Sequence, residues 1–308
     1  MSSIFKEAAK KLPYPLFLRI FYAWFFLGPR RRFESNRRRG GFARLTQEDL
    51  EQRKTSDTLF VLGSGPSINQ ISGERWQAIA RHDSVGFNFW VFHPFVPKMY
   101  FMESIYRERD RVTDRYLEKY DACVRARGAE YGSTLKVVSG LHERGRHHVW
   151  DWPGEWKEGF KAVCDLPGPA RTEREFERML RYLGGRGAFA GWARLPYLFK
   201  HASSVTTMIA LGLRMGYRKI VLCGIDLGVH QYFYQDPELY PGTACLEFYP
   251  RSAELDILAP VPWRIPADVV ICAMKRELLD PAGVELYVEN RSSKLWPAVP
   301  EAPDSIFE

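Results

Sequence analysis

The segment at residues 58–67, TLFVLGSGPS, constrains the fold of this chain more than any other. Its first half is a short, continuous apolar run, which is typical of a parallel strand covered on both faces. Gly63 and Gly65 then permit a tight turn, and Pro66 suits the first turn of a helix, which we expect over 68–80. The segment therefore predicts a strand, a glycine turn and a helix in an α/β sheet.

The same turn predicts a phosphate site. A helix that begins directly after a glycine turn leaves free N–H groups and the positive end of its dipole facing outward, which suits a diphosphate or a nucleotide monophosphate. The predicted ligand-binding residues are Gly63, Ser64, Gly65, Pro66 and Ser67. A plain strand-to-helix turn, in which small residues serve packing alone, explains the same five residues.

A second helix–strand pair lies much later in the chain. Ser203 or Ser204 can cap a helix that Gly216 ends, and the apolar strand 219–223 follows. Asp226 comes directly after that strand, at the carboxyl end, where open α/β sheets bind their ligands. We therefore add Asp226 and the two serines to the candidate ligand-binding residues.

Strands and helices alternate over most of the chain. We expect strands near 58–63, 83–88, 98–102, 134–138, 219–224 and 284–288, and helices near 68–80, 106–125, 172–183, 203–215 and 268–279. This order predicts a mostly parallel, doubly wound, Rossmann-like α/β sheet in one domain spanning 51–308. An irregular insertion over about 140–200 and a lid over about 228–263 complete the expected domain.

Composition narrows the class of protein. The chain has 308 residues, 45% of them hydrophobic, which is enough to fill one large core. Its five cysteines show no C-x-x-C pairing and no secretory signal is evident, so we expect reduced thiols in the cytoplasm. His147 and His148 stand among arginines, which indicates a solvated basic loop rather than a metal site. Neither a metal nor a cofactor is expected.

The first 50 residues are expected to form a basic, amphipathic segment at a membrane surface. Residues 12–28 are apolar but contain two prolines and Arg19, so they suit an interfacial helix better than a spanning one. Its aromatic residues would enter the headgroup boundary while arginines bind anionic lipid at the inner face of the cell membrane. The aromatic residues are Phe17, Phe21, Trp24 and Phe25, and the arginines are Arg30, Arg31, Arg32, Arg37, Arg38 and Arg39.

Other roles for this segment remain open. It can instead be an arm packed on the domain or a contact between two copies of the chain. Nucleic-acid binding is not expected, because the arginines adjoin an aromatic belt and no recognised reader module.

Several motifs together resemble a known family. They are GSGPS at 63–67, Asn88 after SVGFN, the pair Ser203–Ser204 before a helix ending in MGY, and KIVLCGID. In order and spacing they resemble glycosyltransferase family 42, bacterial sialyltransferases that use CMP-activated sialic acid. The pattern is also similar to motility-associated flagellin glycosyltransferases and to pterin pyrophosphokinases. The resemblance covers residues 57–104 and 200–235, and it implies a metal-independent, GT-A-like variant of the Rossmann fold.

The resemblance implies roles for individual donor-binding residues. Ser64 and Gly65 match the family's Asn-Gly in the first turn, and Asn88 matches an asparagine that contacts the donor. Ser203 and Ser204 match a Thr-Ser pair that contacts cytidine and the carboxylate of the sugar. A helix cap or turn support is the alternative role for each of these side chains.

The lid and the proton acceptor match the family less closely. Tyr234 matches one of two lid tyrosines that hold the departing phosphate, and Tyr232 has to replace the other, because Gly228 stands in its position. The family's catalytic histidine aligns with the region 262–266, in the sequence VPWRIP. This region contains no histidine. The remaining candidate bases near the strand ends are Glu103, His201 and His230.

These observations predict a membrane-surface glycosyltransferase. It would transfer a sialic-acid-like or other acidic sugar from a CMP-activated donor to a glycan or glycolipid acceptor, as a monomer or a homo-oligomer. The alternatives are a nucleotide or pterin phosphotransferase of the same fold and a non-catalytic binding protein.

Overall fold

The computed structural model describes residues 12–105, 111–191, 196–228, 231–246 and 265–308. An eight-stranded sheet has the order β1-β6-β5-β4-β3-β2-β9-β10, and every neighbouring pair is parallel. Its strands are β1 (Ala43–Arg44), β2 (Thr58–Leu62), β3 (Asp83–Phe87), β4 (Met99–Glu103), β5 (Leu135–Ser139), β6 (Phe160–Ala162), β9 (Lys219–Cys223) and β10 (Glu285–Val288). The expected parallel α/β sheet and each of its expected strands are confirmed.

The order of the strands reverses direction at β2. Strands β3, β4, β5 and β6 are added in turn on one side of β2, and the chain then returns to the other side with β9 and β10. All residues of β2 are buried, as its unbroken apolar sequence requires. The carboxyl ends of β2 and β9 therefore meet at a topological switch point, where sheets of this kind bind ligands.

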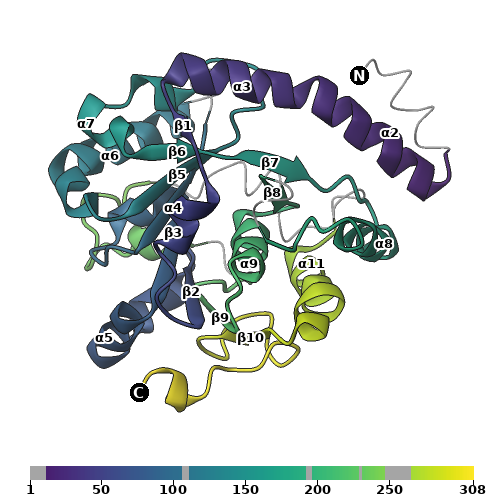
Figure 1. The fold of residues 1–308 in the computed structure, drawn as a ribbon. Helices are drawn as coiled ribbons and strands as arrows, with labels where there is room; N and C mark the ends of the chain where they lie inside the picture. The colour runs from purple at the N-terminus through teal and green to yellow at the C-terminus, as the bar shows by residue number, and fades with distance from the viewer. Residues whose placement is uncertain (1–11, 106–110, 192–195, 229–230, 247–264) are drawn as a thin grey trace.

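Helices cover both faces of the sheet. Figure 1 shows α5, α6 and α7 on one face and α8, α9 and α11 on the other. Their bounds are α5 (Gly73–Arg81), α6 (Arg111–Arg127), α7 (Gly154–Glu158), α8 (Glu173–Gly184), α9 (Ser204–Arg214) and α11 (Ala267–Met274), and α11 continues into the π-helical turn η6 (Lys275–Leu279). The sheet is therefore doubly wound, as expected from the alternation in the sequence.

The helix expected over 68–80 is two helices. A short 3-10 helix, η1 (Pro66–Gln70), follows the glycine turn, and Ile71 is extended. The α-helix α5 begins afresh at Gly73, because the hydroxyl of Ser72 accepts the Arg75 N–H at 3.2 Å and so caps it. The positive end of a long helix does not face the turn.

The segment 140–200, expected to be irregular, carries regular structure. Strand β6 belongs to the main sheet, and β7 (Cys164–Pro167) pairs in parallel with β8 (Tyr197–Lys200), with α8 between them in sequence. These strands have only three or four residues each, which is too short for a periodic pattern to reveal them. The small second sheet lies beside the main one and brings further side chains toward its carboxyl edge.

The N-terminal segment is packed on the domain rather than set apart from it. Strand β1 pairs with β6 at the edge of the main sheet. Helices α2 (Tyr14–Leu27) and α3 (Pro29–Gly40) run end to end along one side of the molecule, with Leu18 and Phe25 buried. The hydroxyl of Tyr22 donates to the carbonyl of Pro167 at 3.1 Å. Within the described ranges, no helix has the length and apolar character needed to span a membrane.

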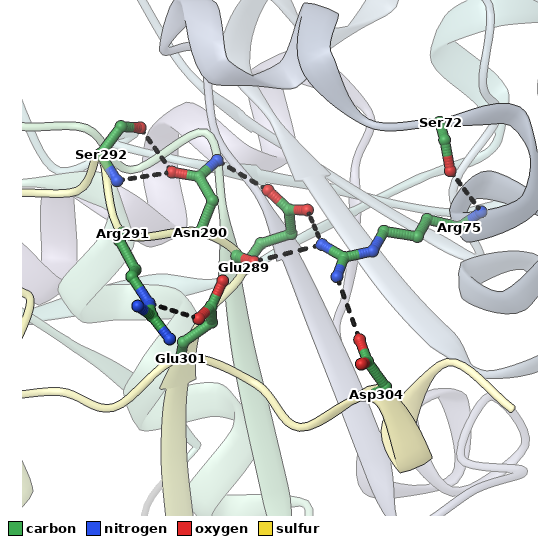
Figure 2. Close-up of polar contacts among 8 residues, drawn as sticks. All are labelled: Ser72, Arg75, Glu289, Asn290, Arg291, Ser292, Glu301 and Asp304. Carbon is green, nitrogen blue, oxygen red and sulfur yellow. Dashed lines mark hydrogen bonds and ion pairs between the residues drawn. The ribbon is translucent and has the colours of Figure 1, made fainter.

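Ion pairs clamp the C-terminal segment onto α5. The guanidinium of Arg75 lies between two carboxylates, 2.6 Å from buried Glu289 and 3.3 Å from Asp304 (Figure 2). Beside them, Arg291 pairs with Glu301 at 2.7 Å. Because Glu289 directly follows β10, this clamp fixes the end of the chain against the switch-point half of the sheet.

Candidate functional site

The glycine turn after β2 is bonded to the end of β9. The N–H of Gly63 donates to the Cys223 carbonyl and the N–H of Gly65 donates to the Gly224 carbonyl, both at 2.8 Å. A Cβ added at Gly65 would lie 2.3 Å from a carboxylate oxygen of Asp226, so packing alone requires glycine there. The N–H groups of these two glycines are therefore used within the protein.

Asp226 occupies the place where the sequence predicts an external anion. Its carboxylate accepts the Ser67 N–H at 3.0 Å and the Ser67 hydroxyl at 2.5 Å, and both residues are buried. Asp226 is thus an internal cap for η1. Of the predicted turn residues, Ser64, Gly65 and Pro66 keep some contact with solvent.

Asn88 joins three elements at the carboxyl edge of the sheet. Its amide nitrogen lies 3.2 Å from the hydroxyl of Ser204, at the start of α9, and its amide oxygen accepts the Glu103 N–H at 3.1 Å. The hydroxyl of Tyr100 donates to the Asn88 carbonyl. Asn88 has a φ of 55°, a left-handed conformation that asparagine tolerates better than most residues. Three residues predicted from separate motifs are therefore in one cluster.

The start of α9 carries hydroxyls without partners. Ser203 is the N-cap residue but makes no capping bond. Within the described residues its Oγ and the Oγ1 of Thr207, one turn along the helix, are buried without a hydrogen-bond partner. A buried hydroxyl in that state costs free energy that a bound ligand atom would recover. Thr207 was not predicted, because a threonine inside an apolar helix has the pattern of a core residue.

Glu103 pairs with a lysine that the sequence does not single out. The ammonium of Lys200, at the end of β8, forms an ion pair with the Glu103 carboxylate. Burial lowers the pKa of Lys200, but the nearby carboxylates of Glu103 and Asp165 outweigh it, and the net shift is upward. Lys200 therefore keeps its charge beside the Asn88 cluster, where it offsets the negative charge of Glu103.

Asp165 and His142 form a second polar pair next to Lys200. Asp165 is 1% exposed and accepts the Gly140 N–H at 2.8 Å, and its Oδ2 lies 3.5 Å from Nδ1 of His142. Burial raises the pKa of Asp165, but the effect of Lys200 and His142 is larger and the net shift is downward. Asp165 is therefore ionised near neutrality. Its Oδ1 has no hydrogen-bond partner in the described part of the chain. Both residues lie in the segment expected to be irregular, where no pattern points to them.

The ring of His201 is oriented by the backbone of Gly168. Its Nδ1 lies 2.7 Å from the carbonyl of Gly168. A carbonyl only accepts, so Nδ1 carries the proton and Nε2 is the acceptor nitrogen of the neutral ring. The ring packs on Phe176, with 4.6 Å between centroids. Of the three predicted bases, Glu103 and His201 thus lie at the ends of β4 and β8.

The described part of the lid is docked on the glycine turn. The Phe233 N–H donates to the Ser64 carbonyl at 2.9 Å, and the amide of Asn69 donates to the Phe233 carbonyl at 3.0 Å. Tyr234 is 1% exposed, and burial first, then its tyrosine neighbours, raises its pKa far above the ordinary value. Its ring lies in the core, away from solvent. Tyr232 stacks on it at 5.1 Å and is only half-buried.

Some predicted residues lie outside the described ranges. They are His230, most of the lid and all but the last two residues of 262–266. The pair expected to be solvated, His147 and His148, is buried: His147 bonds the Ser104 hydroxyl at 2.7 Å, and His148 accepts the Ile105 N–H at 3.0 Å. No group of three His, Cys, Asp or Glu side chains within the described residues is arranged to hold a metal ion.

Neither a scan against protein-family models nor a search of curated proteins gives a match to this chain.

Proposed function

We propose that this protein is a glycosyltransferase that uses a CMP-activated, sialic-acid-like or other acidic sugar and needs no metal ion. The contact that joins Asn88 to Ser204 and Glu103 is the observation that carries the proposal. It gathers amide, hydroxyl and carboxylate groups at the carboxyl edge of a doubly wound sheet, next to the switch point. Two of these residues, Asn88 and Ser204, belong to the motifs that resemble glycosyltransferase family 42.

In this proposal the start of α9, rather than the glycine turn after β2, binds the anionic part of the donor. The first N–H groups of an α-helix and its dipole attract an anion, and α9 has 11 residues. The Ser203 hydroxyl, which has no hydrogen-bond partner among the described residues, and the Ser204 hydroxyl lie at this point. In the proposed complex they bind the cytidine and the carboxylate of the donor sugar.

Charge and proton transfer fall to neighbouring residues. Lys200 offsets the negative charge of Glu103 and of the donor. Tyr232, half-buried where Tyr234 is in the core, holds the departing phosphate by its hydroxyl. His201 accepts the proton of the acceptor hydroxyl at Nε2, and its bond to Gly168 holds the ring in the required tautomer. The acceptor is a glycan or glycolipid of the cell surface.

A thermal-shift comparison of CMP, CDP, UDP, GDP and ATP, with and without magnesium, tests the proposal. CMP should stabilise the protein most and without metal, by about 2.7 kcal/mol at a hundredfold excess over its dissociation constant. Ser204→Ala should lose this shift, and Ser292→Ala, a control at an exposed serine that hydrogen-bonds only to Asn290 in the described residues, should keep it. A preference for ATP with magnesium would replace the proposal with a phosphotransferase, and no response to any nucleotide would favour a non-catalytic binding protein.

A further inference from the structure

Helix α2 is apolar on the side that faces away from the domain as well as on the side that packs on it. Its buried residues are Leu18, Tyr22 and Phe25. On the outward side Leu16 is 44% exposed and Leu27 is 63% exposed. A surface helix of a soluble protein normally has a polar outer face, and one that is apolar all round is covered on both sides. The outer face of α2 thus requires an additional partner.

The same side of the molecule is strongly basic. In the described ranges Arg31 and Arg38 of α3 are exposed and have no carboxylate partner, and Arg19 is the single charged residue of α2. The one acidic residue of α3, Glu34, is already paired with Arg37 at 3.1 Å and Arg44 at 2.8 Å. The partner of this face is therefore apolar in part and negatively charged in part.

We propose that the outer face of α2 and α3 docks on a membrane that contains anionic lipid. The two helices run end to end along one side of the molecule, so the outer face of both helices can lie flat on a bilayer (Figure 1). A row of half-buried rings flanks the leucines, with 5.8 to 5.9 Å between successive centroids, and it ends in Trp24, a residue type that is enriched at the headgroup boundary, which favours lipid over an acidic protein surface. The row is Tyr14, Phe17, Phe21 and Trp24.

This face is tied to the loop that carries His142. From α3, Nε of Arg32 donates to the His142 carbonyl at 3.0 Å, and the Asn36 amide donates to the Leu141 carbonyl at 2.8 Å. Docking would therefore hold the cluster around Asp165 and Lys200 at a fixed height above the lipid. The docking itself is independent of the chemistry of the donor.

Sedimentation of the full chain with lipid vesicles tests the docking. Vesicles of phosphatidylcholine with added phosphatidylglycerol should bind the protein, and vesicles of phosphatidylcholine alone should not. Each exposed arginine contributes roughly fivefold to binding at an anionic surface, so the double variant Arg31→Gln/Arg38→Gln should bind about 25-fold more weakly. The control variant Arg125→Gln/Arg218→Gln, which removes the same charge from exposed positions elsewhere, should bind as the wild type does.

A second pair of variants separates the apolar contribution. Leu16→Ser/Leu27→Ser should lower binding by at least tenfold, whereas Leu239→Ser, at an exposed leucine 56% accessible elsewhere on the chain, should not. Equal binding of the arginine variant and its control would overturn the proposal. So would a concentration-dependent dimer that the Leu16/Leu27 variant dissociates, because the face would then be a contact between copies. Neither measurement uses a nucleotide sugar, so failure here and failure of the proposed function are distinguishable.

Discussion

The carboxylate of Asp226 lies 3.0 Å from the N–H of Ser67, although 159 positions separate the two residues in the chain. The bond joins the end of β9 to the first turn of η1, so a side chain of the protein fills the space at the switch point. From sequence alone this turn suits a phosphate, but in the structure the carboxylate of Asp226 accepts the hydrogen bonds of Ser67 that a phosphate would accept.

Replacing Asp226 by asparagine should destabilise the fold. An amide has one acceptor oxygen where the carboxylate has two, so one of the two bonds from Ser67 is lost and the other loses its charge assistance. We therefore expect the free energy of unfolding to fall by about 2–4 kcal/mol, and by about 1 kcal/mol for Ser67→Ala. Urea unfolding measures both, and the double variant should lose less than the sum, because the two residues share one interaction. A variant of Asp226 with unchanged stability and no CMP binding would instead assign the carboxylate to the ligand.

Two substitutions of Asn88 should separate its backbone from its side chain. Asn88→Gly accepts the left-handed φ, whereas Asn88→Ala adds strain of about 1 kcal/mol there. Both remove the amide that contacts Ser204, so both should weaken CMP binding by about 1–3 kcal/mol in calorimetric titration. Retained affinity in the glycine variant would show that Asn88 serves the turn alone.

His93 should make the protein less stable in mild acid. Burial, followed by the charge of Arg127, lowers the pKa of His93 from 6.5 to about 3, and its Nδ1 accepts the Phe95 N–H at 3.0 Å. Below pH 6.5 the unfolded chain thus binds a proton that the folded chain does not. As the pH decreases from 6.5 to about 3, the free energy of unfolding therefore decreases by about 1.4 kcal/mol per pH unit. His93→Gln should flatten that slope in urea titrations from pH 7 to about pH 4. An unchanged slope would show that carboxylates alone set the acid limit.

Removal of residues 1–45 should abolish folding rather than release a soluble core. The deletion takes away β1 and the buried residues of α2 and α3. Single substitutions in α2 test the same packing with a smaller change. Phe25→Ala, at a fully buried ring, should lower the free energy of unfolding by about 3–5 kcal/mol. Leu27→Ala, at a 63% exposed position, should lower it by about 0.5 kcal/mol or less. Denaturant unfolding of both variants provides the measurement. A folded deletion protein would contradict the packing described.

The long strands were predictable because their signal is local. An apolar run such as 59–62 between turn residues has few alternatives, and the order of strands and helices then determines a doubly wound sheet. Strand β6 has no such signal, since Lys161 interrupts its three residues and its place depends on pairing with β1 and β5. Pairing between distant segments cannot be read from local pattern.

The candidate site was predictable where one motif presents its residues at a strand end. Asn88 and Ser204, chosen from separate motifs, lie 3.2 Å apart, because each follows or precedes an element whose position the sheet determines. Lys200 and Asp165 could not be found, since their pairing partners come from segments far apart in the chain. For Gly65 the sequence left two roles open, because the same glycine serves close packing against a carboxylate and a phosphate site equally well, and the structure shows the close packing.

The bond from Tyr22 to Pro167 also has a consequence for synthesis of the chain on the ribosome. The helix that contains Tyr22 is made first, but its binding surface on β7, β8 and α8 is complete only after Lys200. At roughly 5–20 residues per second, the intervening stretch of about 170 residues takes roughly 10–35 seconds to translate. Throughout that interval both apolar sides of α2 are uncovered, so a chaperone or a lipid surface that covers this helix early would raise the yield of native protein.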